Sequence, residues 1–481
     1  MPKEGIQEIE VQGLIYETPV IPPLEGIRGY DLPVEDQVWH RRTEYEQWEW
    51  NIDSMDENKR PLKMWWETAS PEQTKWYTEE IHRINFGDWI MINGEKTYMN
   101  KYCYFFHQWF YLQEGIHPTY RETSLEYFRF YQLCEDDPMT LGDCGIKGRR
   151  VGLSSMSASI SLLIAILESN TLQGVVSKTG DDAYEMYLMI KNGLEKLPPF
   201  LMPELNKVTE SEIHIAKPTK KISSNNKMVN ADKGLNNRIN HANTTENAYD
   251  GRRIRKVTID EASKWKKINV QMTLSKISDT LVVGVAVGGH VSVFSTVDKG
   301  DDGGDNFRTI WDGSDHLGKL DQFGRTRTKL KRFFLAGFRG LNGYVGKYGE
   351  SISETPTPEQ TEFLKQWRDP ITGVPCPNPH IGAIEFLQVN RKMLENDPEL
   401  HADQVRKYPF KWQEVFEGVN NRCHFILSSL NDQISAIEEQ LQELDKKEMG
   451  RRGRFVQMPN GCADWRDDNA GMWYILQFLP Q

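Results

Sequence analysis

Short apolar runs alternate with longer amphipathic stretches between residues 136 and 345. Apolar runs of a few residues bounded by turn residues predict buried strands, and apolar positions that recur every three or four residues predict helices. Strands that alternate with helices predict an α/β domain with a mostly parallel sheet flanked by helices. The expected strands are 142–147, 174–178, 213–216, 254–259, 290–296 and 332–336, and the expected helices include 154–168, 181–194 and 269–278.

The pattern changes on both sides of this region. Residues 1–135 are aromatic-rich and hold eight of the 14 tryptophans before residue 110, and early prolines predict an extended arm followed by short helices. In residues 346–481, a Thr-Pro-Thr-Pro stretch predicts a linker into a helix at 359–366. Leucines and isoleucines from Leu430 to Leu444 predict a further helix with one apolar face. We therefore expect three parts, the last of them mainly helical.

Composition narrows the class of protein. The length of 481 residues fits two or three domains, and the net charge of −11 argues against a protein that coats nucleic acid over its whole surface, although a local basic groove remains possible. The six cysteines are scattered without a C-x-x-C pair, which indicates reduced thiols in a cytosolic protein. The longest apolar run, at 158–167, is too short to span a bilayer, so no membrane association is expected.

A basic loop stands between the first expected strand and the first expected helix, and it reads Lys147-Gly148-Arg149-Arg150-Val151-Gly152-Leu153-Ser154-Ser155. In a common phosphate loop, backbone N–H groups hold phosphate, a lysine after the second glycine contacts the outer phosphates, and the next hydroxyl binds Mg²⁺. Gly152 fits that glycine and Ser154 the hydroxyl, but Leu153 occupies the lysine position. Lys147, Arg149 and Arg150 offer the missing charge. The loop alone is equally compatible with a basic turn before an ordinary helix.

A second motif lies about a hundred residues later, where the apolar strand Lys256–Ile259 ends in Asp260 and Glu261. A carboxylate at such a strand end holds hydrated Mg²⁺, and the next one orients or deprotonates the attacking water. We assign Asp260 to the metal and Glu261 to the water. The alternative is a strand that simply ends in two solvated acids, which the phosphate loop upstream makes less favoured.

These motifs resemble those of the large terminase subunit of tailed bacteriophages, the ATPase that pumps DNA into the procapsid. In several branches the lysine also sits at the start of the loop, and the branch found in gut crAss-like phages appears similar. The strand end Asp260-Glu261-Ala262, the hydroxyls Ser295 and Thr296 after another expected strand, and the segment 406–416 with its Tyr-Pro pair fit as well. The resemblance covers about residues 90–481.

The resemblance implies an ASCE-type P-loop fold that uses ATP and Mg²⁺, and it assigns roles residue by residue. Lys147 and Arg150 would contact the phosphates, with Arg150 as a catalytic arginine acting in cis. The remaining implied roles are Mg²⁺ binding by Ser154 and Asp260, catalysis by Glu261, coupling of hydrolysis to movement by Ser295 and Thr296, adenine contact by Gln132, and an arginine finger for the neighbouring subunit from Arg252 or Arg253.

The same resemblance implies partners. These are double-stranded DNA, a portal protein, a small terminase subunit and further copies of the chain in a ring, a pentamer when on the portal, within the host cell cytoplasm. Family members normally continue into a nuclease domain, so we expect the nuclease to be separate or missing and this chain to lack nuclease activity. Candidate contacts to DNA phosphates are Lys329, Lys331 and Arg332, or Arg451, Arg452 and Arg454 in a basic loop.

Two other functions stay open. Asp260–Ser263 reads like a DEAD/DEAH helicase box and residues 449–454 like a helicase arginine motif, but a helicase needs a second motor domain, and the later part of the chain has mainly helical signals. A nucleotide-binding or structural protein without hydrolysis is the second alternative, because Leu153 replaces the usual lysine.

Overall fold

The structure, a computed structural model, describes residues 4–48, 69–217, 234–284, 286–297, 303–416, 450–457, 463–468 and 470–476. Residues Met1–Phe416 form one compact unit and Glu417–Gln481 a second. The helix predicted from Leu430 to Leu444 lies outside the described residues. The division of the chain into three parts stays a prediction.

An eight-stranded sheet forms the centre of the first unit. Its strand order is β14-β5-β13-β10-β6-β9-β8-β7. The six strands from β14 to β9 are parallel, and β8 and β7 continue the sheet antiparallel. The strands are β5 (Gly142–Lys147), β6 (Leu172–Val176), β7 (Leu205–Val208), β8 (Glu212–Ile215), β9 (Asn237–His241), β10 (Lys256–Ile259), β13 (His290–Ser295) and β14 (Leu330–Leu335).

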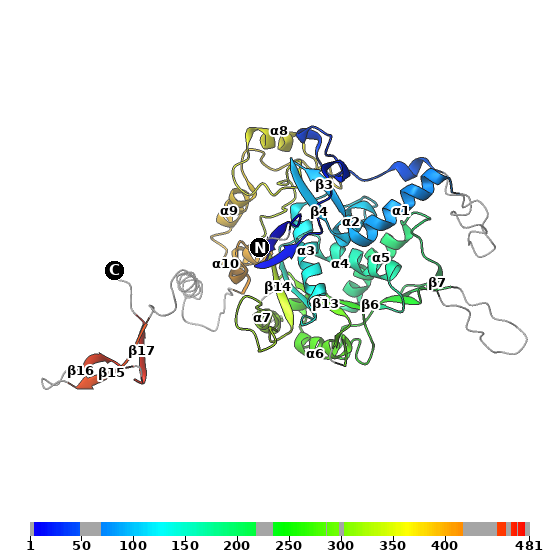
Figure 1. The fold of residues 1–481 in the computed structure, drawn as a ribbon. Helices are drawn as coiled ribbons and strands as arrows, with labels where there is room; N and C mark the ends of the chain where they lie inside the picture. The colour runs from blue at the N-terminus through cyan, green and yellow to red at the C-terminus, as the bar shows by residue number, and fades with distance from the viewer. Residues whose placement is uncertain are drawn as a thin grey trace, which may run out of the picture. The chain divides into compact units, whose positions relative to one another are not determined.

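Helices cover both faces of this sheet (Figure 1). The helices α2 (Lys101–Gln108), α3 (Glu122–Asp136), α4 (Leu153–Leu167) and α5 (Gly180–Glu195) share one hydrophobic core. On the other face, α6 (Val270–Thr280) and α7 (Gly304–Gly313) share a second core. The parallel α/β sheet predicted from the alternating pattern is therefore confirmed, with a strand near each of the six expected ranges.

The strand order fixes where loops converge. β13 is inserted between β5, the strand before the phosphate loop, and β10, the strand that leads to Asp260. This insertion is the arrangement of ASCE-type P-loop proteins, and it confirms the expected fold class. Because β5, β13, β10 and β14 are parallel, the segments after them leave the sheet at the same edge, where ligands bind in such folds.

The N-terminal region contains more regular structure than an arm and short helices. It forms a hairpin of β1 (Glu8–Val11) and β2 (Leu14–Glu17), the 16-residue helix α1 (Pro71–Phe86), and a second hairpin of β3 (Asp88–Ile92) and β4 (Glu95–Met99). The sequence analysis missed both hairpins and underestimated α1. All of them pack into the core shared by α2 to α5.

The outer edge of β14 is closed by side chains rather than by another strand. The Gln12 amide donates to the Phe334 carbonyl oxygen at 3.1 Å and accepts from the Phe334 N–H at 3.2 Å. His316 Nδ1 accepts from the Arg332 N–H at 3.1 Å, while its Nε2 lies 2.8 Å from the Gln12 carbonyl oxygen. The Arg332 N–H and both the N–H and the carbonyl oxygen of Phe334 are thereby satisfied.

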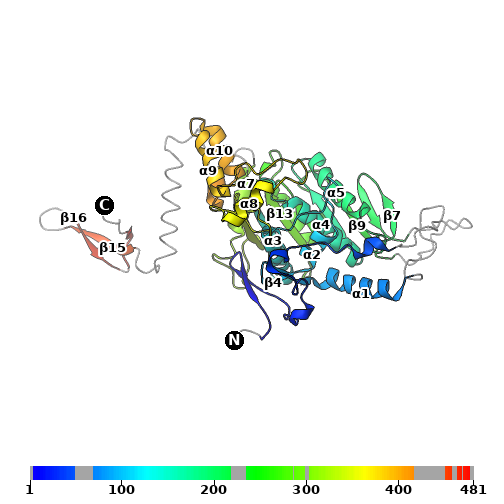
Figure 2. The same cartoon turned by 90° about the horizontal axis from the view of Figure 1, so that it is seen from above.

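The helices α8 (Pro358–Gln366), α9 (Ala383–Met393) and α10 (Pro398–Lys407) gather at one end of the first unit, and β7 lies at the opposite end (Figures 1 and 2). The second unit contains a three-stranded antiparallel sheet of β15 (Gly450–Gln457), β16 (Ala463–Asp467) and β17 (Trp473–Leu476). The basic loop expected at 449–454 was wrong, because Gly450–Arg454 belong to β15. No described helix is both long and apolar enough to cross a membrane.

A buried polar network joins α4 to the middle of the sheet. The Lys256 ammonium donates to Ser157 Oγ at 2.8 Å and Thr258 Oγ1 at 3.1 Å, and all three side chains are buried. Asp143 lies nearby on β5 and accepts from Ser292 Oγ at 2.8 Å. Burial lowers the pKa of Lys256 to about 8, because its charged form has lost water without gaining a carboxylate in contact.

This shift predicts a pH-dependent stability. The pKa of Lys256 is about 8 in the fold and about 10.5 unfolded, so between these values the unfolded chain binds more protons and stability rises with pH. The free energy of unfolding of the wild type minus that of Lys256→Met should increase by about 2 to 3 kcal/mol from pH 7 to pH 10. Urea denaturation of both proteins at each pH measures it. A pH-independent difference would contradict the assignment.

Candidate nucleotide-binding site

The phosphate loop connects β5 to α4 through two left-handed residues. Arg150 has φ 61° and Gly152 has φ 82°. Gly152 is the N-cap of α4 and supplies no side chain to the helix N-terminus. The first N–H groups of this 15-residue helix therefore have no capping side chain, which is the arrangement that favours an anion at a helix start.

Lys147 is the centre of the site. Its ammonium donates to Ser154 Oγ and to Asp260 Oδ1, both at 3.0 Å, and lies 3.7 Å from Glu261 Oε1. Ser154 Oγ in turn donates to Asp260 Oδ2 at 3.0 Å. Three residues from β5, α4 and the end of β10 thus close a ring of hydrogen bonds. The structure therefore brings together, at this edge of the sheet, four residues that the sequence analysis singled out: Lys147, Ser154, Asp260 and Glu261.

The electrostatics follow from this ring. Lys147 is only 8% exposed, and burial by itself would lower its pKa. The carboxylates of Asp260 and Glu261, with their hydrogen bonds, outweigh burial and raise the pKa above its ordinary value. Burial likewise acts to raise the pKa of Glu261, but Lys147 and Lys264 overcome it and lower that pKa. The lysine and the glutamate are therefore both charged near neutral pH.

Glu261 is held from a second side as well. Lys264 Nζ lies 2.6 Å from Glu261 Oε2, and Thr296 Oγ1 donates to the same oxygen at 3.0 Å. Lys264 Nζ also donates to Thr296 Oγ1 at 2.7 Å. Glu261 adopts a left-handed conformation with φ 50°, which turns the chain sharply after β10. A carboxylate fixed by two cations and a hydroxyl has little freedom to rotate.

The hydroxyls after β13 join this turn through the backbone. Ser295 Oγ accepts from the Ser263 N–H at 3.1 Å, and Ser263 Oγ donates to the Thr296 carbonyl oxygen at 2.9 Å. The end of β13 and the turn after β10 are thus bonded to each other directly. Any displacement of Glu261 would be transmitted to Ser295 and Thr296, the pair expected from the sequence to couple hydrolysis to movement.

The other loop residues divide into two groups. The side chains of Arg149 and Arg150 are exposed and form no hydrogen bond or ion pair with any residue that the structure describes. Gly148 is buried, and Ser155 makes a long contact of 4.0 Å with Met189 Sδ. Leu153 is 1% exposed and packs in the core, so its side chain cannot contact phosphate, and binding through its backbone N–H stays a prediction. The free loop cations are therefore two arginines.

Three expected residues lie away from this cluster. Gln132 sits on α3, where its Oε1 accepts from Tyr16 Oη at 3.0 Å. It makes no hydrogen bond to the phosphate loop within the described ranges. Arg252 and Arg253 are exposed and precede β10, so they lie toward the amino ends of the parallel strands, whereas Asp260 follows the carboxyl end of β10. They are not part of their own chain's site, so their role toward a neighbouring subunit stays a prediction.

Sequence reasoning missed Lys264 and the exact place of the segment 407–409. Lys264 had a signal, because it follows Glu261 by three residues in a turn. The segment also had a signal in the sequence, its Tyr-Pro pair, but nothing in the sequence indicated where the segment would lie in the fold. The Lys407 carbonyl oxygen accepts from the Arg149 N–H at 3.0 Å, and the Pro409 carbonyl oxygen accepts from the Gly337 N–H at 2.6 Å. The segment therefore lies directly on the phosphate loop.

The donor set suits a hydrated magnesium ion. A hydroxyl and a carboxylate, Ser154 and Asp260, lie 3.0 Å apart, and both already contact a cation, the Lys147 ammonium. Hard oxygen donors of this kind, completed by phosphate oxygens and water, are what Mg²⁺ takes. No cluster of three or more His, Cys, Asp or Glu side chains that could hold a metal occurs in the described chain, here or at another place.

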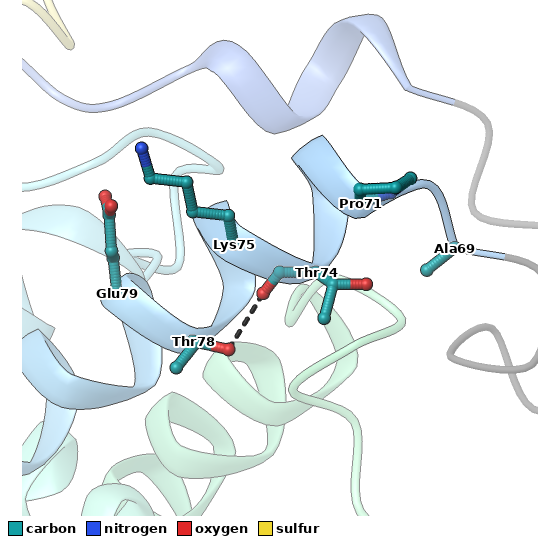
Figure 3. Close-up of a pocket in the computed structure, with 6 residues that line it drawn as sticks. All are labelled: Ala69, Pro71, Thr74, Lys75, Thr78 and Glu79. Carbon is teal, nitrogen blue, oxygen red and sulfur yellow. Dashed lines mark hydrogen bonds between the residues drawn. The ribbon is translucent and has the colours of Figure 1, made fainter.

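Two hollows lie apart from this cluster. One, of about 540 Å³, runs along α1 beside Lys75 and Glu79, whose side chains Figure 3 shows on the outside of the helix. The other, of about 500 Å³, has no acidic residue in its lining and lies between the N-terminal arm, the segment 117–121 and the segment after β14, with Trp39, Arg121 and Trp367 among its walls. Neither contains a residue of the Lys147 cluster.

The strand order defines an α/β fold of the P-loop-like, ASCE type. No family model and no curated protein matches the chain. Among solved structures, it is similar to a mutant ATPase domain of the Thermus phage P74-26 large terminase, with a TM-score of 0.32 and 10% identity over 58% of this chain and 91% of that one. It is also similar to the HK97 bacteriophage large terminase, with a TM-score of 0.37 and 12% identity over 64% of this chain and 53% of that one. The residue assignments rest on the contacts given above.

Gly152 provides a test of the loop geometry. A left-handed alanine costs about 1 kcal/mol of stability, and a Cβ on Gly152 would meet no atom within 4 Å. Gly152→Ala should therefore fold, lose about 1 kcal/mol, and bind nucleotide more weakly because the helix start changes its conformation.

Gly251→Ala is the matched control for this variant. Gly251 has φ 70° and the same open space, but it lies before β10. It should lose similar stability and keep wild-type nucleotide affinity. Chemical denaturation and fluorescent-nucleotide titration measure the two effects, and equal affinities for both variants would contradict the assignment of Gly152.

Proposed function

We propose that this chain is the ATP-hydrolysing motor subunit of a phage DNA-packaging machine, the large terminase subunit. The observation that carries the proposal is the buried ring of Lys147, Ser154 and Asp260, with Glu261 beside it, at the carboxyl edge of a parallel sheet. Charged side chains are rarely buried together without a purpose in binding or catalysis.

The ring assigns a task to each of its members. Lys147 replaces the ammonium that Leu153 cannot supply, and it lies close enough to Ser154 to reach phosphates bound at the start of α4. Ser154 and Asp260 would hold Mg²⁺, which supplies positive charge to the phosphate oxygens when it is bound. Glu261, held by Lys264 and Thr296, orients the attacking water and accepts its proton.

Arginines complete the charge balance. The exposed Arg150 reaches phosphate as a cation acting in cis, and the planar guanidinium suits developing charge on phosphate oxygens. Arg252 or Arg253 would act on a neighbouring subunit, since they lie on the far edge of their own sheet. A ring of subunits, each with an arginine directed at the next site, is consistent with that placement.

The packaging function rests on motif order and on the link to Thr296. The hydroxyl of Thr296 contacts the proposed catalytic Glu261, so a change at the reacting phosphate has a direct path to β13. The proposed partners are duplex DNA, a portal protein and a small terminase subunit, in the host cell cytoplasm. The crAss-like branch is the proposed origin.

The candidate DNA-contacting residues differ in how far their side chains are exposed and paired within the chain. Lys331 Nζ lies 2.7 Å from Asp137 Oδ2 and Arg332 Nη1 3.2 Å from Asp315 Oδ2, so both are occupied within the first unit. Arg454 is 67% exposed in its side chain, with Asp468 at 3.4 Å. Because the Arg454 side chain is far more exposed than those of Lys331 and Arg332, which are 15% exposed each, we favour the β15 arginines over these two, and the exposed Lys329 stays a candidate.

Glu261→Gln tests hydrolysis directly. The amide keeps the shape of the side chain but cannot accept a proton, so ATP turnover should fall by roughly 10²- to 10⁴-fold while ATP affinity changes little. The control is Glu246→Gln, an exposed glutamate outside the site, which should behave as wild type. Phosphate release and equilibrium binding measure the two quantities.

Three outcomes distinguish an ATP-hydrolysing protein from one that binds nucleotide without hydrolysis. Wild-type hydrolysis that Glu261→Gln abolishes supports the proposal. Tight ATP binding with no wild-type hydrolysis, with or without DNA, would support a binding protein instead. Hydrolysis that survives in Glu261→Gln would remove the catalytic role of this residue.

DNA should stimulate the ATPase without regard to sequence. Contacts to phosphates carry no sequence information, so random and defined duplexes of equal length should stimulate equally. Stimulation should fall steeply as salt rises, because phosphate contacts release counterions. Arg451→Gln combined with Arg454→Gln should weaken DNA binding and leave the DNA-independent rate unchanged. Titration with duplex DNA at several salt concentrations tests this expectation.

A further inference from the structure

Arg406 is a largely buried cation whose guanidinium keeps some contact with solvent and has no partner among the described residues. Its side chain lies at the end of α10, and the residue is 5% exposed. Within the described part of the chain its guanidinium forms no hydrogen bond and no ion pair. The neighbouring Lys407, in contrast, pairs with Asp403 on the same helix. Arg406 therefore differs from the ordinary charged residues of α10.

Two half-buried arginines of this unit show how a guanidinium is commonly satisfied. Arg391 is bonded to Glu414 at 2.9 Å, and Arg255 to Glu168 at 2.8 Å. An arginine cannot lose its proton in a protein, so burial without an anion carries a cost of desolvating its charge. Arg129, the other buried arginine of the described chain, has no carboxylate in contact but donates to the Tyr98 carbonyl oxygen at 2.9 Å, whereas Arg406 forms no such bond there.

The backbone next to Arg406 lies on the phosphate loop. The Lys407 carbonyl oxygen accepts from the Arg149 N–H at 3.0 Å and would lie 3.6 Å from a Cβ on Gly148. A Cβ on Gly337 would lie 2.5 Å from Tyr408 Cα, and one on Gly148 would lie 3.1 Å from Gly337 Cα. Only glycines allow the three segments to approach so closely, and consecutive Cα atoms lie about 3.8 Å apart, so Arg406 starts beside the loop.

This segment is also held firmly in place. Arg391 Nη2 donates to the Tyr408 carbonyl oxygen at 2.8 Å, and its guanidinium lies 3.9 Å from the centroid of the Phe410 ring. Glu414, the partner of Arg391, accepts from the Phe410 N–H at 2.7 Å. The contacts fix the chain just after Arg406, so its backbone position is set before any ligand binds.

We propose that Arg406 contacts the phosphate chain of the nucleotide bound at the phosphate loop. The inference deepens the proposed function and rests on it. The anion is a phosphate because the adjacent loop combines an uncapped helix start with the two exposed arginines, Arg149 and Arg150, that likewise have no partner in the described chain. Arg406 adds a third guanidinium from the C-terminal side of the fold.

Two consequences follow from the origin of Arg406. Leu153 stands where an ammonium would touch the outer phosphates, and Arg406 supplies positive charge from another element. Arg406 also belongs to the segment that ends the first unit at Phe416. Phosphate binding would therefore tie this segment more tightly to the loop, and release of phosphate would loosen it.

The test compares Arg406→Met and Arg406→Lys with Arg238→Met, whose arginine side chain is 55% exposed on β9. Each full-length protein is titrated with ATP, ADP and adenosine, and its melting temperature is recorded with and without ATP. Arg406→Met should weaken ATP binding by roughly 10-fold or more, because a charge-assisted hydrogen bond to phosphate is lost. Adenosine binding should not change, and Arg406→Lys should recover part of the ATP affinity.

The melting temperatures give a second readout that a structural role would not produce. Removing an unpaired buried charge should leave the ligand-free Arg406→Met protein at least as stable as wild type. ATP should stabilise it less than it stabilises wild type. Should Arg406→Met fail to fold, Arg406→Lys decides the matter, because it keeps the charge and loses the planar fork.

Failure of the inference differs from failure of the proposed function. Wild-type ATP affinity in Arg406→Met, or in Arg406→Lys if Met does not fold, would overturn the contact to phosphate. Lys147→Ala is measured in parallel. If Lys147→Ala also binds ATP like wild type, the phosphate loop itself is misassigned and the proposed function falls with it.

Discussion

The buried ammonium of Lys147 holds the site together. Asp260 and Glu261 are adjacent carboxylates near the end of a buried strand, and without a cation between them their repulsion and desolvation would oppose folding. Lys147 contacts both, and it also fixes Ser154 at the start of α4. Because Lys147 is the last residue of β5, the sheet itself delivers this charge, whereas a lysine at position 153 would come from the helix.

This location has a cost that the rest of the loop offsets. In the proposed nucleotide complex, a lysine bonded to Asp260 this deep in the sheet would neutralise only part of the phosphate charge, and the rest would fall to side chains from outside the sheet. Arg149 and Arg150 lie on the exposed loop, and Arg406 approaches from α10. Lys264 contributes on the other side by holding Glu261. The site distributes over several elements the charge that one lysine and one arginine supply in more common loops.

The sequence predicted six of the eight strands because most of these are apolar runs, the signature of buried parallel strands. It missed β7 (LNKV) and β9 (NRINH), whose polar residues hide that signature. It also brought Lys147, Ser154, Asp260 and Glu261 to one edge, since loops after parallel strands must meet there. It failed where long-range pairing decides structure. The hairpin of β1 and β2 has short polar strands that form by packing on α3, and β15 contains three arginines and two glycines that predict a loop by local propensity.

Contacts between distant segments were equally beyond the sequence. Nothing in residues 406–410 indicates that their carbonyl groups bond to the N–H groups of Arg149 and Gly337, because backbone groups are common to all residues. For the same reason, the sequence could not predict that Arg406 has no partner among the described residues. Only the neighbours of an arginine determine whether it has an anion, and those neighbours come from other parts of the fold.

The closure of β14 by Gln12 and His316 limits how copies of this chain can associate. The unpaired backbone groups of an exposed edge strand can pair with a strand of another chain, and filaments form in that way. Here the outward amide and carbonyl of Phe334 and the amide of Arg332 are already occupied by side chains. A second copy that approached this border would therefore meet side chains there, and these outward backbone groups would not be free to form a shared strand ladder.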